Sequence, residues 1–297
     1  HPLHGYYTTR QPFGAAGDSP SDSAVLRDNP GTWLDFTDLV FIDPIGTGFS
    51  RSLVDEAETK KAFYGSKQDI EYLSNTVYDW LVKYGRLTSR KYLVGESYGG
   101  YRVPRLAYYL QARTGVGVNG IVMVSPYLDP AAIGDETALS PLPWAINLPS
   151  MAAGYLERQG KLNAANMADV EAYARGEFVT DFLKGASDKE ATDRLSGKVA
   201  SYIGLDPTLV RRMDGRIDIR TYLREIHRST GQIGSVYDSN VTAYDPFPAS
   251  ADSNYGDPLL DGIMGPTTSA AVDFITNQVG WKASWHYEAL SYNVNRL

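Results

Sequence analysis

The amino-acid sequence predicts an α/β fold with a parallel sheet, on the strength of two observations. Short apolar runs rich in β-branched residues, at 38–44, 91–95 and 120–130, are separated by longer segments in which apolar residues recur at helical spacing. The order strand, helix, strand, helix, strand is typical of a doubly wound sheet. Beyond Pro130, helix-length segments follow one another without the alternation that marks a strand.

This change of pattern divides the chain into two parts. We expect an α/β core at residues 1–130, a mostly helical insertion at 131–290, and the start of a return to the core at 291–297. An insertion that follows a catalytic strand commonly forms a lid over the site.

Three segments precede the first predicted helix. Residues 1–37 are rich in Gly, Pro, Ser and Asp and predict a loop. The run DLVFIDP at 38–44 is brief and contains a proline at its end, which favours a buried parallel strand over a helix. The following IGTGFS at 45–50 lacks the full pattern of a phosphate-binding loop, so we interpret it as a turn.

A helix is expected over residues 66–84, where apolar side chains recur three and four apart: Ile70, Leu73, Val77, Trp80, Leu81 and Tyr84. Ser66 is the expected N-cap, with Asp69 three residues on, and Gly85 ends the helix.

The next strand is predicted at 91–95, in the run KYLVG. A second helix should then run from Ser97 to about residue 113, provided that Pro104 lies near its first turn. Residues 120–130 supply another strand and complete a strand–helix–strand unit.

Composition argues against several classes of function. The net charge of −7 and the lack of a basic run make nucleic acid a poor candidate partner. No apolar run reaches the roughly 18 residues that a membrane helix needs, and the absence of cysteine excludes disulfides and thiolate catalysis. Asp252, Asp257 and Asp261 lack histidines at ligand spacing, so we expect no metal site.

The stretch Gly95-Glu96-Ser97-Tyr98-Gly99 fits the pattern G-x-S-x-G at the point where the predicted strand meets the predicted helix. In such a turn the serine occupies strained backbone, and the two glycines let strand and helix approach closely. The turn also directs the Tyr98 amide and the helix N-terminus at a developing oxyanion. Ser97 is therefore a candidate nucleophile; a solvated serine in an ordinary turn is the alternative.

Glu96 lies beside this candidate nucleophile, where an ionised carboxylate would repel an oxyanion. Its position makes sense if the carboxyl group is buried and protonated, so that it hydrogen-bonds a substrate carboxylate. The alternative is a side chain turned outward to solvent, and the spacing of the residues does not choose between the two.

The segment GESYGGYRVPRLA, at 95–107, resembles the nucleophile motif of the serine carboxypeptidases, which are α/β-hydrolases that remove C-terminal residues at acidic pH. DNPGTWLDFTDLVFIDPIGTGFSRS, at 28–52, is similar to an upstream block of that family. LPSMAAGYLERQGKL, at 148–162, and VYDSNVTAYDP, at 236–246, resemble lid segments of its bacterial members. These blocks occur in the family's order.

The resemblance implies an α/β-hydrolase fold and serine-type carboxypeptidase activity on peptides with a free C-terminal carboxylate, without a cofactor. It makes Ser97 the acylated nucleophile, the Tyr98 amide half of the oxyanion hole, and Glu96 a protonated recogniser of the substrate's terminal carboxylate. Gly99 and Gly100 stand where the family has Ala-Gly or Gly-Gly. The family's habit of export implies a periplasmic or secreted protein.

The other members of a hydrolase triad are not evident. After Ser97 the chain holds two histidines: His227, in a predicted surface helix where we expect it to be solvated, and His286, in a segment that resembles lid sequence. The family's Gly-Gly-Pro-Gly loop has only FGAAG, at 13–17, as a poor substitute. We therefore expect an incomplete sheet, a triad Asp and His outside this chain, and little or no activity from this polypeptide alone.

Two further interpretations stay open. The same strand–turn–helix arrangement would serve an esterase or acyltransferase acting on a different acyl group. Alternatively, the triad has decayed in a protein retained for binding. The sequence gives no indication of the oligomeric state.

Overall fold

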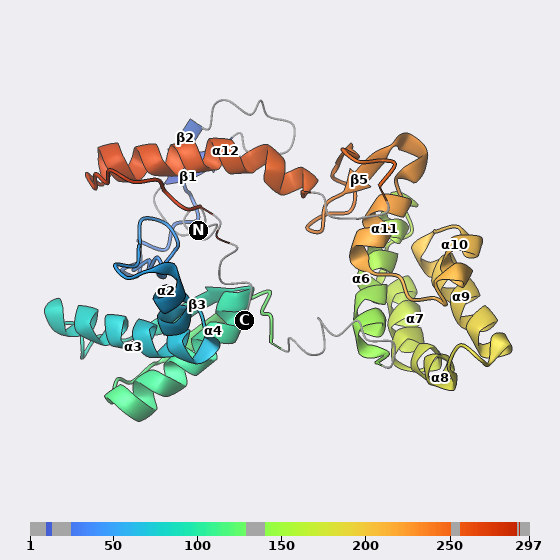
Figure 1. The fold of residues 1–297 in the computed structure, drawn as a ribbon, viewed down its shortest axis with the longest axis horizontal. Coiled ribbons are helices and arrows are strands. Elements are labelled where there is room, and N and C mark those ends of the chain that lie inside the picture. The colour runs from blue at the N-terminus through green and yellow to red at the C-terminus, as the bar shows by residue number, and fades with distance from the viewer. Residues whose placement is uncertain (1–9, 14–24, 129–139, 251–255, 290, 292–297) are drawn as a thin grey trace. The chain divides into compact units, whose positions relative to one another are not determined.

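The structure, a computed structural model, describes five stretches of the chain: residues 10–13, 25–128, 140–250, 256–289 and 291. The chain divides into two compact units (Figure 1). The first unit takes its described residues from 10–13, 25–128 and from 266 onward, and the second takes 140–250 and 256–265. The second unit therefore ends before residue 290, the predicted end of the insertion.

The first unit is built around one strand–helix–strand unit. β3 (Tyr92–Glu96) and β4 (Gly120–Val124) pair in parallel, with Tyr92 opposite Gly120. Between them runs α4 (Tyr98–Tyr109), which continues into a π-helical turn (Leu110–Thr114), and α3 (Ser66–Lys83) packs against α4. The predicted α/β class, with parallel strands joined by a helix, is confirmed.

The predicted strand at 38–44 is wrong. This run is irregular, it pairs with no strand in the described part of the chain, and three of its apolar side chains are exposed: Val40, Phe41 and Ile42. A strand is stable only where a neighbour satisfies its backbone N–H and C=O groups. An apolar run indicates that a segment could form a strand, but it does not show that another strand lies beside it to pair with.

Short elements surround this run. β1 (Arg10–Phe13) pairs antiparallel with β2 (Val25–Asp28), so the predicted loop at 1–37 is wrong for these residues, whose four-residue runs are too short to show a period. Turn hydrogen bonds confirm the turn at 45–50. α2 (Glu56–Phe63) follows, with Asp55 as its N-cap.

The apolar stripe predicted at 66–84 lies in the core of the first unit except for Tyr84, which is the C-cap of α3 and is 56% exposed. The buried residues of this core are Ile70, Leu73, Leu81, Leu106, Leu110 and Val116. The start of α3 differs from the prediction. Gly65 is the N-cap and Ser66 is the first helical residue, while Asp69 pairs with Arg102 of α4 instead of supporting the cap. Gly85 follows the helix with a φ of 65°, as expected of the residue that ends it.

α4 contains Pro104 at its seventh position, so the expectation that this proline lies near the first turn is wrong. Proline removes one backbone hydrogen bond, yet the helix continues to Tyr109 and the π-helical turn after it. On β4 three successive side chains are exposed: Ile121, Val122 and Met123.

The second unit is mainly helical, as predicted beyond residue 130. Its helices are α6 (Leu142–Arg158), α7 (Ala164–Arg175), α8 (Glu177–Lys184), α9 (Lys189–Ile203), α10 (Pro207–Arg212) and α11 (Ile219–Glu225). Aspartates or asparagine cap four of them through side-chain oxygens: Asn163, Asp188, Asp206 and Asp218. The helices enclose a core that includes Leu148, Phe178, Ile203 and Tyr222.

A small hairpin in this unit was not expected from the sequence. β5 (Gln232–Gly234) pairs antiparallel with β6 (Thr242–Tyr244), and each strand has only three residues. α12 (Pro258–Asp273) follows and continues into a second π-helical turn (Phe274–Gln278). The loop predicted at 244–258 lies partly outside the described residues.

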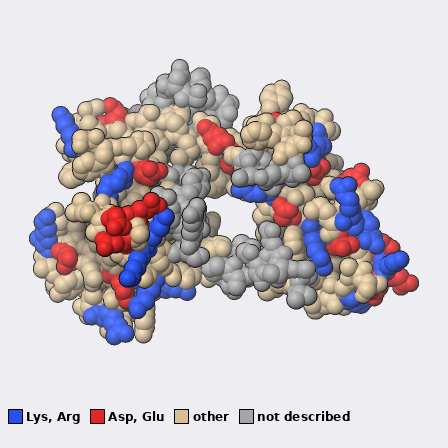
Figure 2. All heavy atoms as spheres, in the orientation of Figure 1, with Lys and Arg blue, Asp and Glu red and all other residues tan. Residues whose placement is uncertain are grey.

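The distribution of charged side chains can be followed on one face of the molecule. On the face drawn in Figure 2, Lys and Arg alternate with Asp and Glu and form no continuous basic surface. Among the described helices, none combines the length and the apolar character needed to span a bilayer.

Candidate active site

Ser97 occupies the turn between β3 and α4, where its backbone is strained. Its φ is 55° and its ψ is −117°, an arrangement that non-glycine residues rarely adopt. The Ser97 amide donates to Val124 O at 3.0 Å, and Ser97 O accepts from the amides of Gly100 and Tyr127 at 2.9 and 3.0 Å. These bonds fix the turn on both sides, and Ser97 itself is exposed.

The glycines of the motif differ in what they contribute. A Cβ at Gly95 would lie 2.1 Å from Gly99 O, and a Cβ at Gly100 would lie 2.4 Å from Pro126 Cβ. At Gly99 nothing lies within 4 Å of the added atom. Close approach of strand and helix therefore requires glycine at 95, and packing on Pro126 requires it at 100, whereas residue 99 has room for alanine.

Two polar groups beside Ser97 have no hydrogen-bond partner among the described residues. The Tyr98 amide is the first of α4 and has no acceptor in the turn. Glu96 is half-buried at the end of β3, and its Oε2 is buried without a partner. A buried unpaired polar atom is rare enough to require an explanation, and a ligand group supplies one.

Neither histidine that the structure describes is hydrogen-bonded to Ser97. His227 belongs to the second unit and is half-buried, with Nε2 2.7 Å from Ser239 O. The prediction that it is solvated on a surface helix is therefore wrong, since Tyr222 and Leu223 of α11 are buried in the core. His286 is exposed, and its backbone carbonyl accepts a bond from Arg51.

One pair near the candidate nucleophile was missed at the sequence level. Arg102, five residues after Ser97, forms a bidentate ion pair with the buried carboxylate of Asp69 on α3. The sequence did contain a signal for this pair: Asp69 lies next to the apolar stripe of a predicted helix. Burying its carboxylate there costs free energy unless a cation pairs with it.

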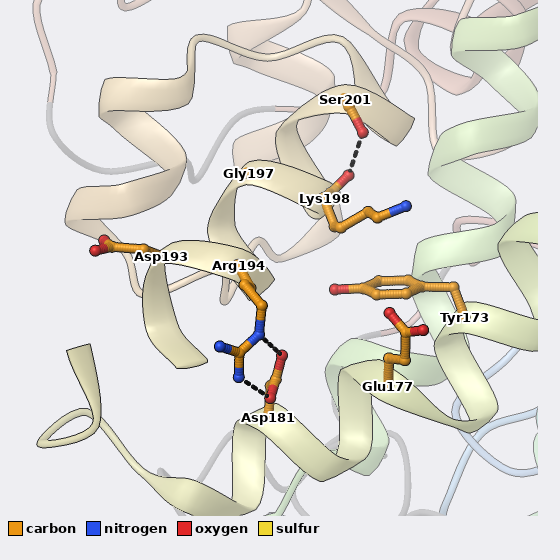
Figure 3. Close-up of a pocket in the computed structure, with 8 residues that line it drawn as sticks. All are labelled: Tyr173, Glu177, Asp181, Asp193, Arg194, Gly197, Lys198 and Ser201. Atoms are coloured by element: carbon orange, nitrogen blue, oxygen red, sulfur yellow. Dashed lines mark hydrogen bonds and ion pairs between the residues drawn. The ribbon is translucent and has the colours of Figure 1, made fainter. Parts of the chain in front are cut away.

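A cavity of about 410 Å³ lies in the second unit, between α7, α8 and α9 (Figure 3). Arg194 and Asp181 of the lining pair with each other, and Asp181 also pairs with Lys184, which is not part of the lining. The lining contains neither histidine nor a strained serine. The charges of Asp181, Arg194 and Lys184 are satisfied by one another, as in ordinary surface ion pairs, and do not indicate a ligand. The cavity offers no chemistry comparable to the turn at Ser97.

The family described as serine carboxypeptidase matches residues 12–184, which include the whole turn. A pheromone-processing carboxypeptidase KEX1 of Ogataea parapolymorpha is 32% identical over 142 residues, 47% of this chain and 21% of that protein. Serine carboxypeptidase-like 44 of Arabidopsis thaliana is 33% identical over 105 residues, which are 35% of this chain and 20% of that protein. A carboxypeptidase Y homolog of Arthroderma benhamiae is 30% identical over 129 residues, which are 41% of this chain and 23% of that protein.

The chain thus spans about a fifth of the length of these curated relatives. No solved structure is significantly similar to it. The family match covers more than half of the chain and includes the parallel strands, the strained serine and the helix that follows it. The chain therefore belongs to the serine carboxypeptidase family, whose fold is that of the α/β-hydrolases.

Proposed function

We propose that this chain carries the nucleophile of a serine-type carboxypeptidase that hydrolyses the last peptide bond of a peptide with a free C-terminal carboxylate. Ser97 Oγ attacks the carbonyl carbon while a general base accepts the hydroxyl proton. The C–N bond breaks, the protonated amine leaves, and water then hydrolyses the acyl ester on Ser97. The Tyr98 amide stabilises the oxyanion of each tetrahedral intermediate.

Glu96 is the proposed recogniser of the substrate's terminal carboxylate. In its protonated form it donates a hydrogen bond to that carboxylate, which distinguishes a carboxypeptidase from an esterase with the same turn. The observation that carries the proposal is the strained, exposed Ser97 flanked by an unpaired Tyr98 amide and an unpaired Glu96 oxygen. The mostly helical second unit is the proposed lid, and export from the cytoplasm is part of the same proposal.

No general base for Ser97 is identified among the residues that the structure describes. Because neither described histidine is bonded to Ser97, we propose that the polypeptide alone acylates slowly. Imidazole added to the solution would then act as the base, since it accepts a proton near neutral pH. This makes the nucleophile testable in the chain as it stands.

The first test is covalent labelling of Ser97. A fluorophosphonate probe forms a bond between Ser97 Oγ and phosphorus, fluoride leaves, and imidazole accepts the proton. We expect labelling that maps to Ser97 by mass spectrometry, rises with imidazole concentration and is absent from Ser97→Ala. No label on Ser97 at any imidazole concentration would reject its role as nucleophile and favour a protein retained for binding.

The second test separates a carboxypeptidase from an esterase. The substrates are a depsipeptide, with an ester in place of its last peptide bond and a free carboxylate, and the same compound with that carboxylate amidated. Glu96→Ala should slow acylation by the free acid by about 10- to 150-fold, the value of a hydrogen bond to a charged group. The matched variant Glu96→Gln keeps a donor and should lose less. Equal losses on both substrates would favour the esterase.

A further inference from the structure

A buried ion pair connects α3 to the helix that follows Ser97. The Asp69 side chain is 4% exposed and that of Arg102 is 21% exposed. Arg102 Nε lies 2.6 Å from Asp69 Oδ2, and Nη2 lies 3.1 Å from Oδ1. Two parallel bonds fix both the position and the plane of the guanidinium group, which a single bond would leave free to rotate.

The fixed guanidinium group in turn contacts the side chain of Tyr98. Arg102 follows Tyr98 by four residues, so both lie on one face of α4. The guanidinium carbon is 5.0 Å from the centre of the Tyr98 ring, within the range of a cation–π contact. Tyr101 stacks on the same ring, with centroids 5.5 Å apart. Burial raises the pKa of Tyr98, and the charge of Asp69 adds to that effect.

Asp69 also connects to the turn at 45–50 through Tyr72. The Tyr72 hydroxyl accepts from the Ile45 amide at 3.3 Å. Burial raises the pKa of Tyr72, and the charge of Asp69 and a hydrogen bond to its carboxylate raise it further. One carboxylate thus connects α3, α4 and the turn at 45–50.

The first turn of α4 is where the reaction geometry is set. Ser97 is held in strained backbone, and such strain persists only when the surrounding contacts fix the residues on both sides. On the strand side the bond from Ser97 N to Val124 O does this. On the helix side the first residue is Tyr98, whose ring is held by Arg102.

We propose that Asp69 and Arg102 are positioning residues, which act through Tyr98 to aim its amide at the oxyanion formed on Ser97. This proposal rests on the proposed function, because it requires that the Tyr98 amide serves as an oxyanion donor. Neither Asp69 nor Arg102 is hydrogen-bonded to Ser97; their contacts are with each other and with the tyrosine rings. Their effect should therefore appear in the rate of bond formation and not in the affinity for the probe.

Arg105 provides a matched control. It lies on the same helix with its guanidinium carbon over the Tyr101 ring, and it donates to Tyr101 O within α4. It is exposed, whereas Arg102 is tied to a buried carboxylate of α3. Replacing either arginine by methionine removes a cation over a tyrosine ring, but only Arg102→Met removes the connection to α3.

The experiment measures fluorophosphonate labelling of Ser97 in the whole chain with imidazole present, and separates the maximal rate from the half-saturating probe concentration. We expect Arg102→Met to lower the maximal rate by about tenfold, less than the hundredfold or more of deleting an oxyanion donor, with half-saturation unchanged. Arg102→Lys keeps the positive charge but cannot form two parallel bonds to Asp69, so its maximal rate should lie between those of Arg102→Met and the parent chain. Arg105→Met should match the parent chain.

If Arg102→Met does not fold, because it leaves Asp69 buried without its counter-charge, the double variant Asp69→Asn/Arg102→Gln replaces it. This variant removes both charges and should show the same loss in maximal rate. A parental rate in either variant, or a change confined to half-saturation, would overturn the positioning role while the proposed function stands. A parent chain that is itself unlabelled at Ser97 would overturn both proposals.

Discussion

Replacing Gly95 by alanine is expected to destabilise the first unit far more than the same change at Gly99. The added Cβ at residue 95 would lie 2.1 Å from Gly99 O and 2.8 Å from Val103 Cγ1. At Gly99, which is part of α4, nothing lies within 4 Å of the added atom. The two variants therefore insert the same methyl group into one motif, with and without a collision.

The size of the effect follows from these distances. Carbon and oxygen atoms in contact are ordinarily about 3.3 Å apart, so β3 and α4 would have to separate by about 1 Å at Gly95. The obstructing atom is a backbone oxygen and cannot rotate away, so we expect a cost of about 3 kcal/mol, at the upper end for overpacking. Gly99→Ala should instead stabilise by up to about 1 kcal/mol, since alanine favours a helix.

Urea unfolding measures this difference if the signal comes from the first unit alone. Trp144 is the only tryptophan of the sequence within 140–250, so Trp144→Phe leaves four, at positions outside the second unit. In that background, with a slope of about 2 kcal/mol per molar urea, Gly95→Ala should lower the midpoint by about 1.5 M and Gly99→Ala should not lower it. Equal midpoints for the two alanine variants would refute the requirement for glycine at residue 95.

Two further predictions concern the second unit. Burial lowers the pKa of His227 below 6.5, although its bond to Ser239 O opposes this, so the unfolded chain binds the proton more readily. The thermal midpoint of this unit should therefore fall as the pH drops below about 6.5, and His227→Gln should flatten that dependence. A variant whose thermal midpoint falls with pH as steeply as that of the parent chain would contradict the role of His227. For Asp245, burial raises the pKa, but the bonds from Arg224 and from the Phe247 amide, together with the charges of Arg224 and Arg228, lower it further than burial raises it. Its stabilising contribution is therefore complete above pH 3.8 and lost in more acid solution. Arg224→Met should cost about 3–5 kcal/mol at pH 7, measured by urea unfolding from the part of the fluorescence that Trp144→Phe removes, and a loss below about 1 kcal/mol would contradict the buried pairing.

Local signals predicted the elements that carry the candidate nucleophile. The short apolar run at 91–95, the G-x-S-x-G spacing and the helical run after it each depend on residues close in sequence, and the strained turn at Ser97 has the geometry they predict. The run at 38–44 has a similar composition and is no strand. The difference lies in strand pairing: β3 has β4 beside it, whereas no described strand pairs with the backbone of 38–44.

Asp69 shows why a local rule gave the wrong role to a residue near the site. Three residues after Ser66, it fitted the pattern of a capping box, and that explanation needed no other part of the chain. Its partner Arg102 is 33 residues away on another helix. The position of Asp69 itself carried the contrary signal, because Leu73 of the apolar stripe lies one helical turn further along the same face. A carboxylate on a buried face must be paired or pay a large desolvation cost, so a partner elsewhere in the fold was the stronger expectation, and its identity depended on how α3 packs against α4.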